Sequence, residues 1–330
     1  MTHPVRKFTG VIPPIVTPLT ADRDVDVPSL ERLIRHLLDN GVHGIFALGS
    51  TGEVVLLDDD RRDRVLEVVT ATVAGQVPVV AGCIETSTTR VLQRVRAAEK
   101  YGADAVVVTA PFYALVGPAE IDRHFRAVAG ETSLPVLAYD IPACVQVKLT
   151  AEHLLALAAD GVIYGVKDSS GDDVAFRKLL IDLEDLQGQP GTEDERSSGS
   201  ATNGFVALTG HEVMVDGMLL AGAHGSVPGL GNVDPAGYVR LTTAAAHGDW
   251  ATARAEQDRL TRLFRIVDAA DPDTAGPATR GVSAFKTALA LLGIIDTPTV
   301  SLPLRALQGH ELNRVRDQLE IAGLLPTPSP

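Results

Sequence analysis

The sequence has few cysteines and no apolar run that approaches the length of a membrane-spanning helix. Cys83 and Cys144 are the two cysteines among 330 residues, too few to stabilise a chain of this size by disulfides. No Cys/His spacing typical of a metal site appears. We therefore expect a reduced, cytoplasmic setting and no bound metal. A bilayer requires about 20 consecutive apolar residues. The sequence predicts neither such a span nor a secretory leader.

Basic residues are scarce relative to acidic ones. The chain carries 29 Lys and Arg against 42 Asp and Glu, a formal charge of −13, and the basic residues form no cluster. Proteins that bind nucleic acid through its phosphates need clustered cations, so this class of partner is excluded. With 45% hydrophobic residues, the chain is typical of a globular protein with a large core.

Short apolar runs recur along the chain, each followed by a turn of small residues and an amphipathic stretch. Because these runs are rich in Val, Ile and Ala and do not alternate with polar residues, they predict parallel strands buried on both faces. Helical stretches lie between them. Eight such units predict an α/β fold, a (β/α)8 TIM barrel. The predicted strands are 11–17, 44–49, 77–81, 105–109, 135–139, 163–167, 205–209 and 225–228.

The organisation changes after the eighth unit. Residues 1–248 are predicted to form the barrel, and residues 249–330 a helical extension packed on it, with helices at 249–267, 279–292 and 304–324. The segment 187–204 is polar and rich in Gly and Ser, so it cannot bury much apolar surface. It is predicted to be a mobile loop on the face opposite the catalytic one.

Lys167 stands on the last step of a predicted buried strand, in the sequence YGVKDSSGD. Burial removes water from a lysine and disfavours its charged form, and the neutral amine is a nucleophile toward carbonyl carbon. Tyr139 ends the neighbouring strand, where its hydroxyl can shuttle protons. The alternatives are a strand-end lysine that reaches solvent and a tyrosine buried only for packing.

Two further stretches follow predicted strand ends. The sequence GSTGE at 49–53 supplies backbone N–H groups and the hydroxyls of Ser50 and Thr51, which can hold a carboxylate. Tyr113 follows Pro111 and either extends the proton relay or caps a loop. Because strand ends of a barrel meet at one mouth, these groups are expected to lie together with the predicted nucleophile.

Four motifs, GSTGE at 49–53, PFY at 111–113, YDIP at 139–142 and GVKD at 165–168, resemble those of the dihydrodipicolinate synthase / N-acetylneuraminate lyase family. The resemblance covers nearly the whole chain and implies Schiff-base chemistry on pyruvate or another 2-oxo acid, with an aldehyde as second substrate and no cofactor. It also implies a homo-oligomer, a dimer of dimers.

The resemblance assigns roles to residues of this chain. Lys167 would form the imine, Tyr139 would relay the proton with Ser50, and Tyr113 would enter the site of a neighbouring subunit. The remaining residues it implies are contacts to substrate: Ser50 and Thr51 at the carboxylate, Gly210 and Val227 in the pocket lining, and Ser169 and Glu212 at a polyhydroxy tail. For Ser169 and Glu212, capping of the helix that follows is the alternative.

One position distinguishes branches of this family. Synthases resembling this chain carry an arginine two residues after the proline of the YDIP motif, and Cys144 stands there instead. Cysteine has neither the charge nor the two-pronged geometry of arginine. The segment is similar to sugar-acid lyases at 141–143 and 147–149, which favours 2-keto-3-deoxy sugar acids as substrates. Condensation of pyruvate with aspartate semialdehyde, the 4-hydroxy-tetrahydrodipicolinate synthase reaction, is the alternative.

Hypotheses of other classes stay open. A barrel that binds a 2-oxo acid without turnover would keep the same fold. A phosphate-binding barrel enzyme would need a Gly-rich anion site after the last strands, for which 229–232 (GLGN) is the candidate. His211 is expected to be an ordinary polar loop residue.

Overall fold

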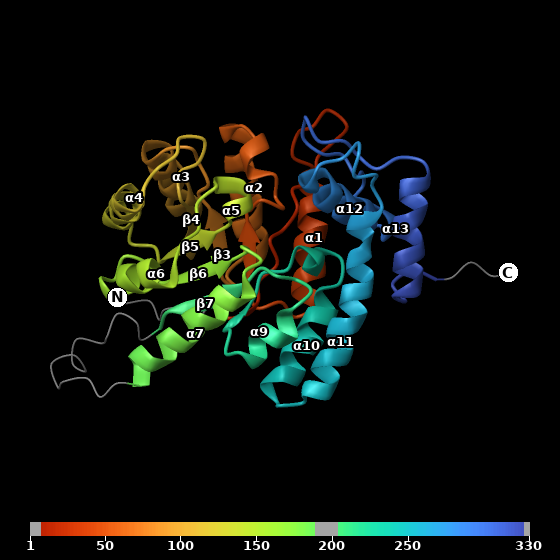
Figure 1. The fold of residues 1–330 in the computed structure, drawn as a ribbon. Coiled ribbons are helices and arrows are strands. Elements are labelled where there is room, and N and C mark those ends of the chain that lie inside the picture. The colour runs from red at the N-terminus through yellow and green to blue at the C-terminus, as the bar shows by residue number, and fades with distance from the viewer. Residues whose placement is uncertain (1–7, 189–203, 327–330) are drawn as a thin grey trace.

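The computed structural model describes residues 8–188 and 204–326, in which eight parallel strands form one sheet (Figure 1). The strand order is β1-β8-β7-β6-β5-β4-β3-β2. A bridge between Pro14 and Phe46 joins the segment after β1 to β2, and Ile15 N donates to Phe46 O at 2.9 Å. This contact closes the sheet, and the predicted barrel is confirmed. The strands are β1 Gly10–Val11, β2 Ile45–Ala47, β3 Val79–Gly82, β4 Ala105–Thr109, β5 Val136–Asp140, β6 Gly165–Asp168, β7 Val206–Thr209 and β8 Gly225–Ser226.

The first and last strands are shorter than the sequence predicts. The prediction placed the first strand at 11–17, but regular pairing ends at Val11 because Pro13 and Pro14 have no N–H to donate to the ladder. The last strand ends at Ser226, and Val227 makes one further bond, from its N–H to Thr209 O at 2.8 Å. The central strands match the predicted ranges within one or two residues because their apolar side chains are buried on both faces.

Helices follow the strands and cover the outside of the barrel (Figure 1). Their first turns are capped by side chains: Asp26 accepts from Ser29 N, and Asp58 accepts from Arg61 N. Gly102 ends a helix in the left-handed conformation. The helices around the barrel are α1 Val27–Asp39, α2 Asp59–Val73, α3 Thr88–Tyr101, α4 Pro118–Glu131, α5 Pro142–Val145, α6 Ala151–Ala159, α7 Asp173–Gly188, α9 Val215–Leu220 and α10 Pro235–Ala246, with single turns η1 Val54–Leu56 and η2 Gly229–Asn232.

Three helices follow the barrel and lie together on one side of it (Figure 1). They are α11 Trp250–Leu263, which continues as the turn η3 Phe264–Asp268, α12 Pro277–Leu291 and α13 His310–Ile321. The third helix was predicted from residue 304 but begins at His310. Pro303 and Gly309 flank this stretch; residues 302–303 and 309 form turns, and residues 304–308 have no regular secondary structure.

The predicted loop at 187–204 and the predicted absence of a membrane-spanning helix can be compared with the described residues. Helix α7 continues to Gly188, so the predicted loop at 187–204 starts later, and its residues 189–203 lie outside the described residues. Across the part of the chain that the structure describes, no helix is both long enough and apolar enough to cross a bilayer.

Candidate active site at the mouth of the barrel

Lys167 and Tyr139 lie opposite each other on neighbouring strands. The register of β5 and β6 pairs these two residues, and Lys167 Nζ donates to Tyr139 Oη at 3.0 Å. The amine also lies 4.1 Å from the centroid of the Tyr139 ring. Lys167 is 4% exposed and Tyr139 is 2% exposed. The structure thus removes the alternative in which the lysine reaches bulk solvent.

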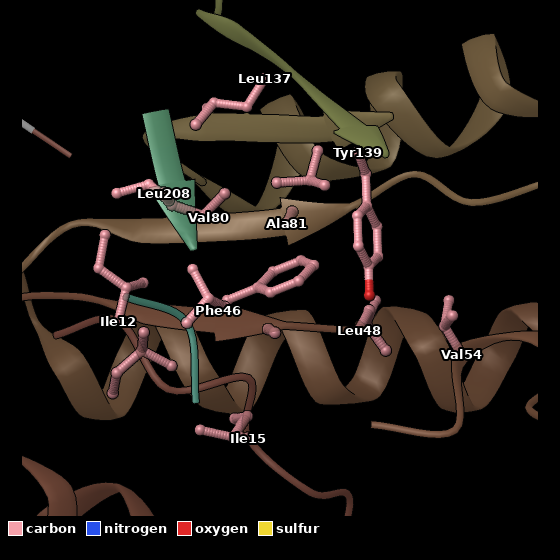
Figure 2. Packing of buried hydrophobic residues seen from close by; sticks show 14 of the residues in the cluster. Ile12, Ile15, Phe46, Leu48, Val54, Val80, Ala81, Leu137, Tyr139 and Leu208 are labelled. Carbon is pink, nitrogen blue, oxygen red and sulfur yellow. The ribbon is translucent and has the colours of Figure 1, made fainter. Parts of the chain in front are cut away.

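An apolar floor lies beneath this pair. Figure 2 shows Tyr139 reaching from β5 toward Leu48, with the ring of Phe46 beside it. Phe46 meets Tyr139 edge to face at 6.4 Å between ring centroids, and its own centroid lies 5.0 Å from Lys167 Nζ. A small cavity below the amine is lined by Ile12, Phe46, Val80, Val107, Leu137, Leu208 and Val227. The amine is therefore held among apolar and aromatic side chains, which exclude water from it.

The turn after β2 brings a second hydroxyl to the tyrosine. Ser50 Oγ lies 3.4 Å from Tyr139 Oη, so the groups form a continuous chain from the lysine amine to Ser50. The turn starts with Leu48 in the left-handed conformation, at φ 57°. Gly82 on β3 permits this, because a Cβ there would lie 1.9 Å from Leu48 O. Thr51 follows in the same turn and is half-buried.

A buried ion pair anchors this turn to the C-terminal helices. Glu53 Oε1 contacts Lys286 Nζ on α12, and both side chains are fully buried. Glu53 Oε2 accepts from Ser301 N at 2.6 Å, and Lys286 donates to Thr299 O at 2.7 Å. Burial lowers the pKa of Lys286, and the charge of Glu53 opposes that effect. This pair is not predicted from the sequence, where its one signal is a lysine inside the apolar stretch of α12.

Gly210 and Ser169 meet where β6 and β7 end. Gly210 N donates to Asp168 O at 2.6 Å, and a Cβ at position 210 would lie 2.0 Å from Ser169 Oγ. Only glycine at position 210 therefore leaves room for the hydroxyl of Ser169. Val227 lines the cavity under the amine, so it lies in the floor of the site.

Glu212 binds the backbone of the protein itself. Its Oε2 accepts from Leu230 N at 2.6 Å, at the start of η2. Desolvation raises the pKa of Glu212 to about 7, although the N–H groups of Leu230 and Gly229 and the charge of Lys167 act in the opposite direction. The segment 229–232 thus already holds an internal carboxylate, which argues against the phosphate site that was considered there. Glu212 therefore contacts the backbone of η2 and does not cap the helix that follows it, and its predicted contact to a substrate tail stays a prediction.

The raised pKa of Glu212 predicts a pH-dependent effect of Glu212→Gln on stability. The folded protein keeps the proton up to about pH 7, whereas the unfolded chain loses it near the ordinary value of 4.5. Between these values the folded state binds more protons, so stability falls as pH rises, by at most about 1.4 kcal/mol per pH unit. Glutamine keeps an oxygen for Leu230 N and does not titrate. Urea unfolding at pH 5, 6, 7 and 8 should show the variant gaining relative to the parent as pH rises; a pH-independent difference would refute this.

Tyr113 lies apart from the other predicted site residues. It is 98% exposed and adopts a left-handed conformation at φ 73°, in the segment between β4 and α4. Within this chain it does not join the hydroxyl relay at Tyr139. A left-handed conformation is uncommon for a residue other than glycine.

Two further residues follow the ends of strands, His211 after β7 and Cys144 after β5. His211 Nδ1 lies 2.9 Å from Asp173 Oδ1 at the start of α7, so this residue links two elements. Cys144 lies exposed on α5, the single turn that follows β5. The position at which the family resemblance implies an arginine in the synthases thus carries an exposed thiol in this chain.

Comparison with known proteins identifies the family of this chain. A model of the Dihydrodipicolinate synthetase family matches residues 7–322. A 4-hydroxy-tetrahydrodipicolinate synthase of Kineococcus radiotolerans is 32% identical over 99% of this chain and 97% of its own length. An uncharacterized DapA-like lyase of Halobacterium salinarum is 35% identical over 96% and 94%. The crystal structure of YagE from Escherichia coli, a prophage protein of the dihydrodipicolinic acid synthase family in complex with pyruvate, superposes with a TM-score of 0.86 at 28% identity, over 96% of this chain and 99% of that one. The chain belongs to the dihydrodipicolinate synthetase family.

Proposed function

We propose that this protein, a class I pyruvate aldolase of that family, forms its imine on Lys167 and acts on 2-keto-3-deoxy sugar acids. Lys167 Nζ attacks the ketone carbon of the substrate, and loss of water gives a protonated imine. Tyr139 Oη, 3.0 Å from Nζ, accepts and returns the protons that these steps move. Tyr139 Oη then takes the proton of the C4 hydroxyl as the carbon–carbon bond breaks, which releases an aldehyde and leaves the electron pair on the pyruvate fragment as an enamine. Protonation of the enamine and hydrolysis then free pyruvate and the lysine.

The turn at Ser50 and Thr51 supports a carboxylate site in this mechanism. Ser50 Oγ lies 3.4 Å from Tyr139 Oη, so a substrate whose carboxylate binds at this turn places its ketone carbon near the amine. Ser169 Oγ lies above Gly210 on the opposite rim, where we assign it to a tail hydroxyl.

Cys144 is the observation that carries the substrate assignment. An aldehyde bearing a carboxylate needs a cation at this rim, and the thiol of Cys144 on α5 provides none. The nearby Lys148 is already bonded to Asp140 and Asp168. A neutral rim suits a hydroxylated tail better than a second carboxylate. The names of several relatives favour the second candidate, condensation of pyruvate with aspartate semialdehyde.

A substrate panel separates the two candidates. Initial rates are measured with several 2-keto-3-deoxy sugar acids and, in the opposite direction, with pyruvate and aspartate semialdehyde. We expect kcat/KM for the best sugar acid to exceed that for the semialdehyde by about tenfold or more. The loss of one charge-assisted hydrogen bond to the substrate accounts for a difference of this size. Cys144→Arg should raise the semialdehyde rate. Efficient condensation by the parent protein would reverse the assignment.

Tyr113 supports a further proposal about assembly. Its exposed ring fits entry into the site of a second copy, where it would extend the relay from Tyr139. We assign the active form to an oligomer, a dimer of dimers. Light scattering that finds a fully active monomer would contradict this role.

A further inference from the structure

Two carboxylates flank the reactive pair on the outer side of the strands, and one lysine binds both. Asp140 directly follows Tyr139 on β5, and Asp168 directly follows Lys167 on β6. Lys148 Nζ contacts Asp140 Oδ2 and lies 3.1 Å from Asp168 Oδ2. Both aspartates are buried, whereas Lys148 is about one-third exposed. The lysine thus joins the ends of two neighbouring strands at the level of the reactive amine.

The remaining bonds of this cluster hold it in one arrangement. Asp140 Oδ1 accepts from Leu149 N at 3.1 Å. Asp168 Oδ1 accepts from Ser170 N at 2.8 Å and from its hydroxyl at 2.7 Å. Lys148 also donates to Ser170 Oγ at 3.0 Å, so its ammonium group has three oxygen partners. Such a fully bonded network is rigid.

Asp168 directly follows Lys167, and Asp140 directly follows Tyr139 on the paired strand, so the charges of this cluster lie close to the reactive amine. Consecutive residues of a strand point to opposite faces, so the two aspartates lie one residue away from the reactive pair across the barrel wall. Nearby carboxylates favour the protonated amine, and imine formation requires the neutral one. Among the residues that the structure describes, three titratable groups of neighbouring elements interact with Lys167: Tyr139 on β5, Glu212 after β7 and Cys144 on α5. None of these carries a positive charge, whereas Lys148 does.

We propose that Lys148 is a positioning residue: it holds the ends of β5 and β6 in register and offsets the charge of Asp140 and Asp168, so that Lys167 becomes nucleophilic at a lower pH. This inference rests on the proposed function, because it assumes the imine at Lys167. It gives a chemical role to the segment 147–149, which the sequence analysis singled out only by resemblance.

The pH dependence of imine trapping tests this role. Parent and variants are mixed with pyruvate and reduced with borohydride, and the initial rate of adduct formation at Lys167 is followed by mass spectrometry from pH 6 to 10. Lys148→Met should move the midpoint of the rising rate upward by about one pH unit. Asp168→Asn should move it downward, and the double variant should return it toward the parent. Lys148→Arg, which keeps the charge, should stay close to the parent.

The outcomes are distinguishable. A folded Lys148→Met protein with an unchanged midpoint, even one with a lower rate, overturns the inference and leaves the proposed function intact. If Lys148→Met does not fold, Asp168→Asn decides: a lower midpoint supports the inference, and an unchanged or higher midpoint overturns it. A parent protein that gains no adduct on Lys167 overturns both the inference and the proposed function.

Discussion

Replacement of Lys167 by alanine should lower turnover of the best sugar acid by about three orders of magnitude or more. The amine lies 3.0 Å from Tyr139 Oη above an apolar floor, and alanine offers no atom that can form the imine. Initial rates of pyruvate release measure the effect. The fold should persist, because alanine fits a site where the lysine has one hydrogen-bond partner and a few apolar neighbours.

Lys178→Ala is the matched control for this loss. Lys178 is an exposed lysine on α7, so its removal should leave turnover near the parent value. A Lys167→Ala protein that keeps a tenth of the parent rate would show that the amine of this residue does not carry the reaction.

Lys286→Met should destabilise the folded protein by about 3–5 kcal/mol. The variant leaves the carboxylate of Glu53 without its cation, at a position with no exposed side-chain surface. Ser301 N still donates to this carboxylate, but one neutral donor does not replace an ion pair. Urea unfolding at pH 7 and a fixed protein concentration gives the difference. Because Glu53 ends the turn that carries Ser50, KM for pyruvate should rise as well.

The double variant Glu53→Gln with Lys286→Met shows whether Lys286→Met lowers the free energy of unfolding through the uncompensated charge of Glu53 or through lost packing. Without either charge, no buried ion remains uncompensated, so the double variant should recover a substantial part of the stability lost by Lys286→Met. A double variant as unstable as the single one, or a Lys286→Met protein within about 1 kcal/mol of the parent, would contradict this account of the pair.

The barrel and the reactive pair follow from local sequence patterns. Apolar runs buried on both faces predict parallel strands, and the fixed direction of strands in a barrel gathers their ends at one mouth. Lys167 and Tyr139 are identifiable because a polar side chain ends each of two such runs, and the register then pairs them. The first strand is shorter than its apolar run predicts because Pro13 and Pro14 have no N–H to donate to the ladder.

Contacts between segments that are distant in the sequence cannot be predicted from local patterns. Glu53 and Lys286 are separated by most of the chain, and nothing local indicates that they meet. Glu212 accepts a hydrogen bond from Leu230 N. Every residue except proline has a backbone N–H, so the type of side chain at position 230 does not indicate this partner. The role of Lys148 depends on two aspartates from different strands, which only the closed sheet brings together.

Intact-protein and peptide mass spectrometry after incubation with pyruvate and borohydride examines the nucleophile most directly. We predict that each chain gains the mass of one reductively attached pyruvate, and that the modified peptide contains Lys167. No gain in mass, or a label carried by a different lysine, would contradict the claim that this buried amine attacks the ketone.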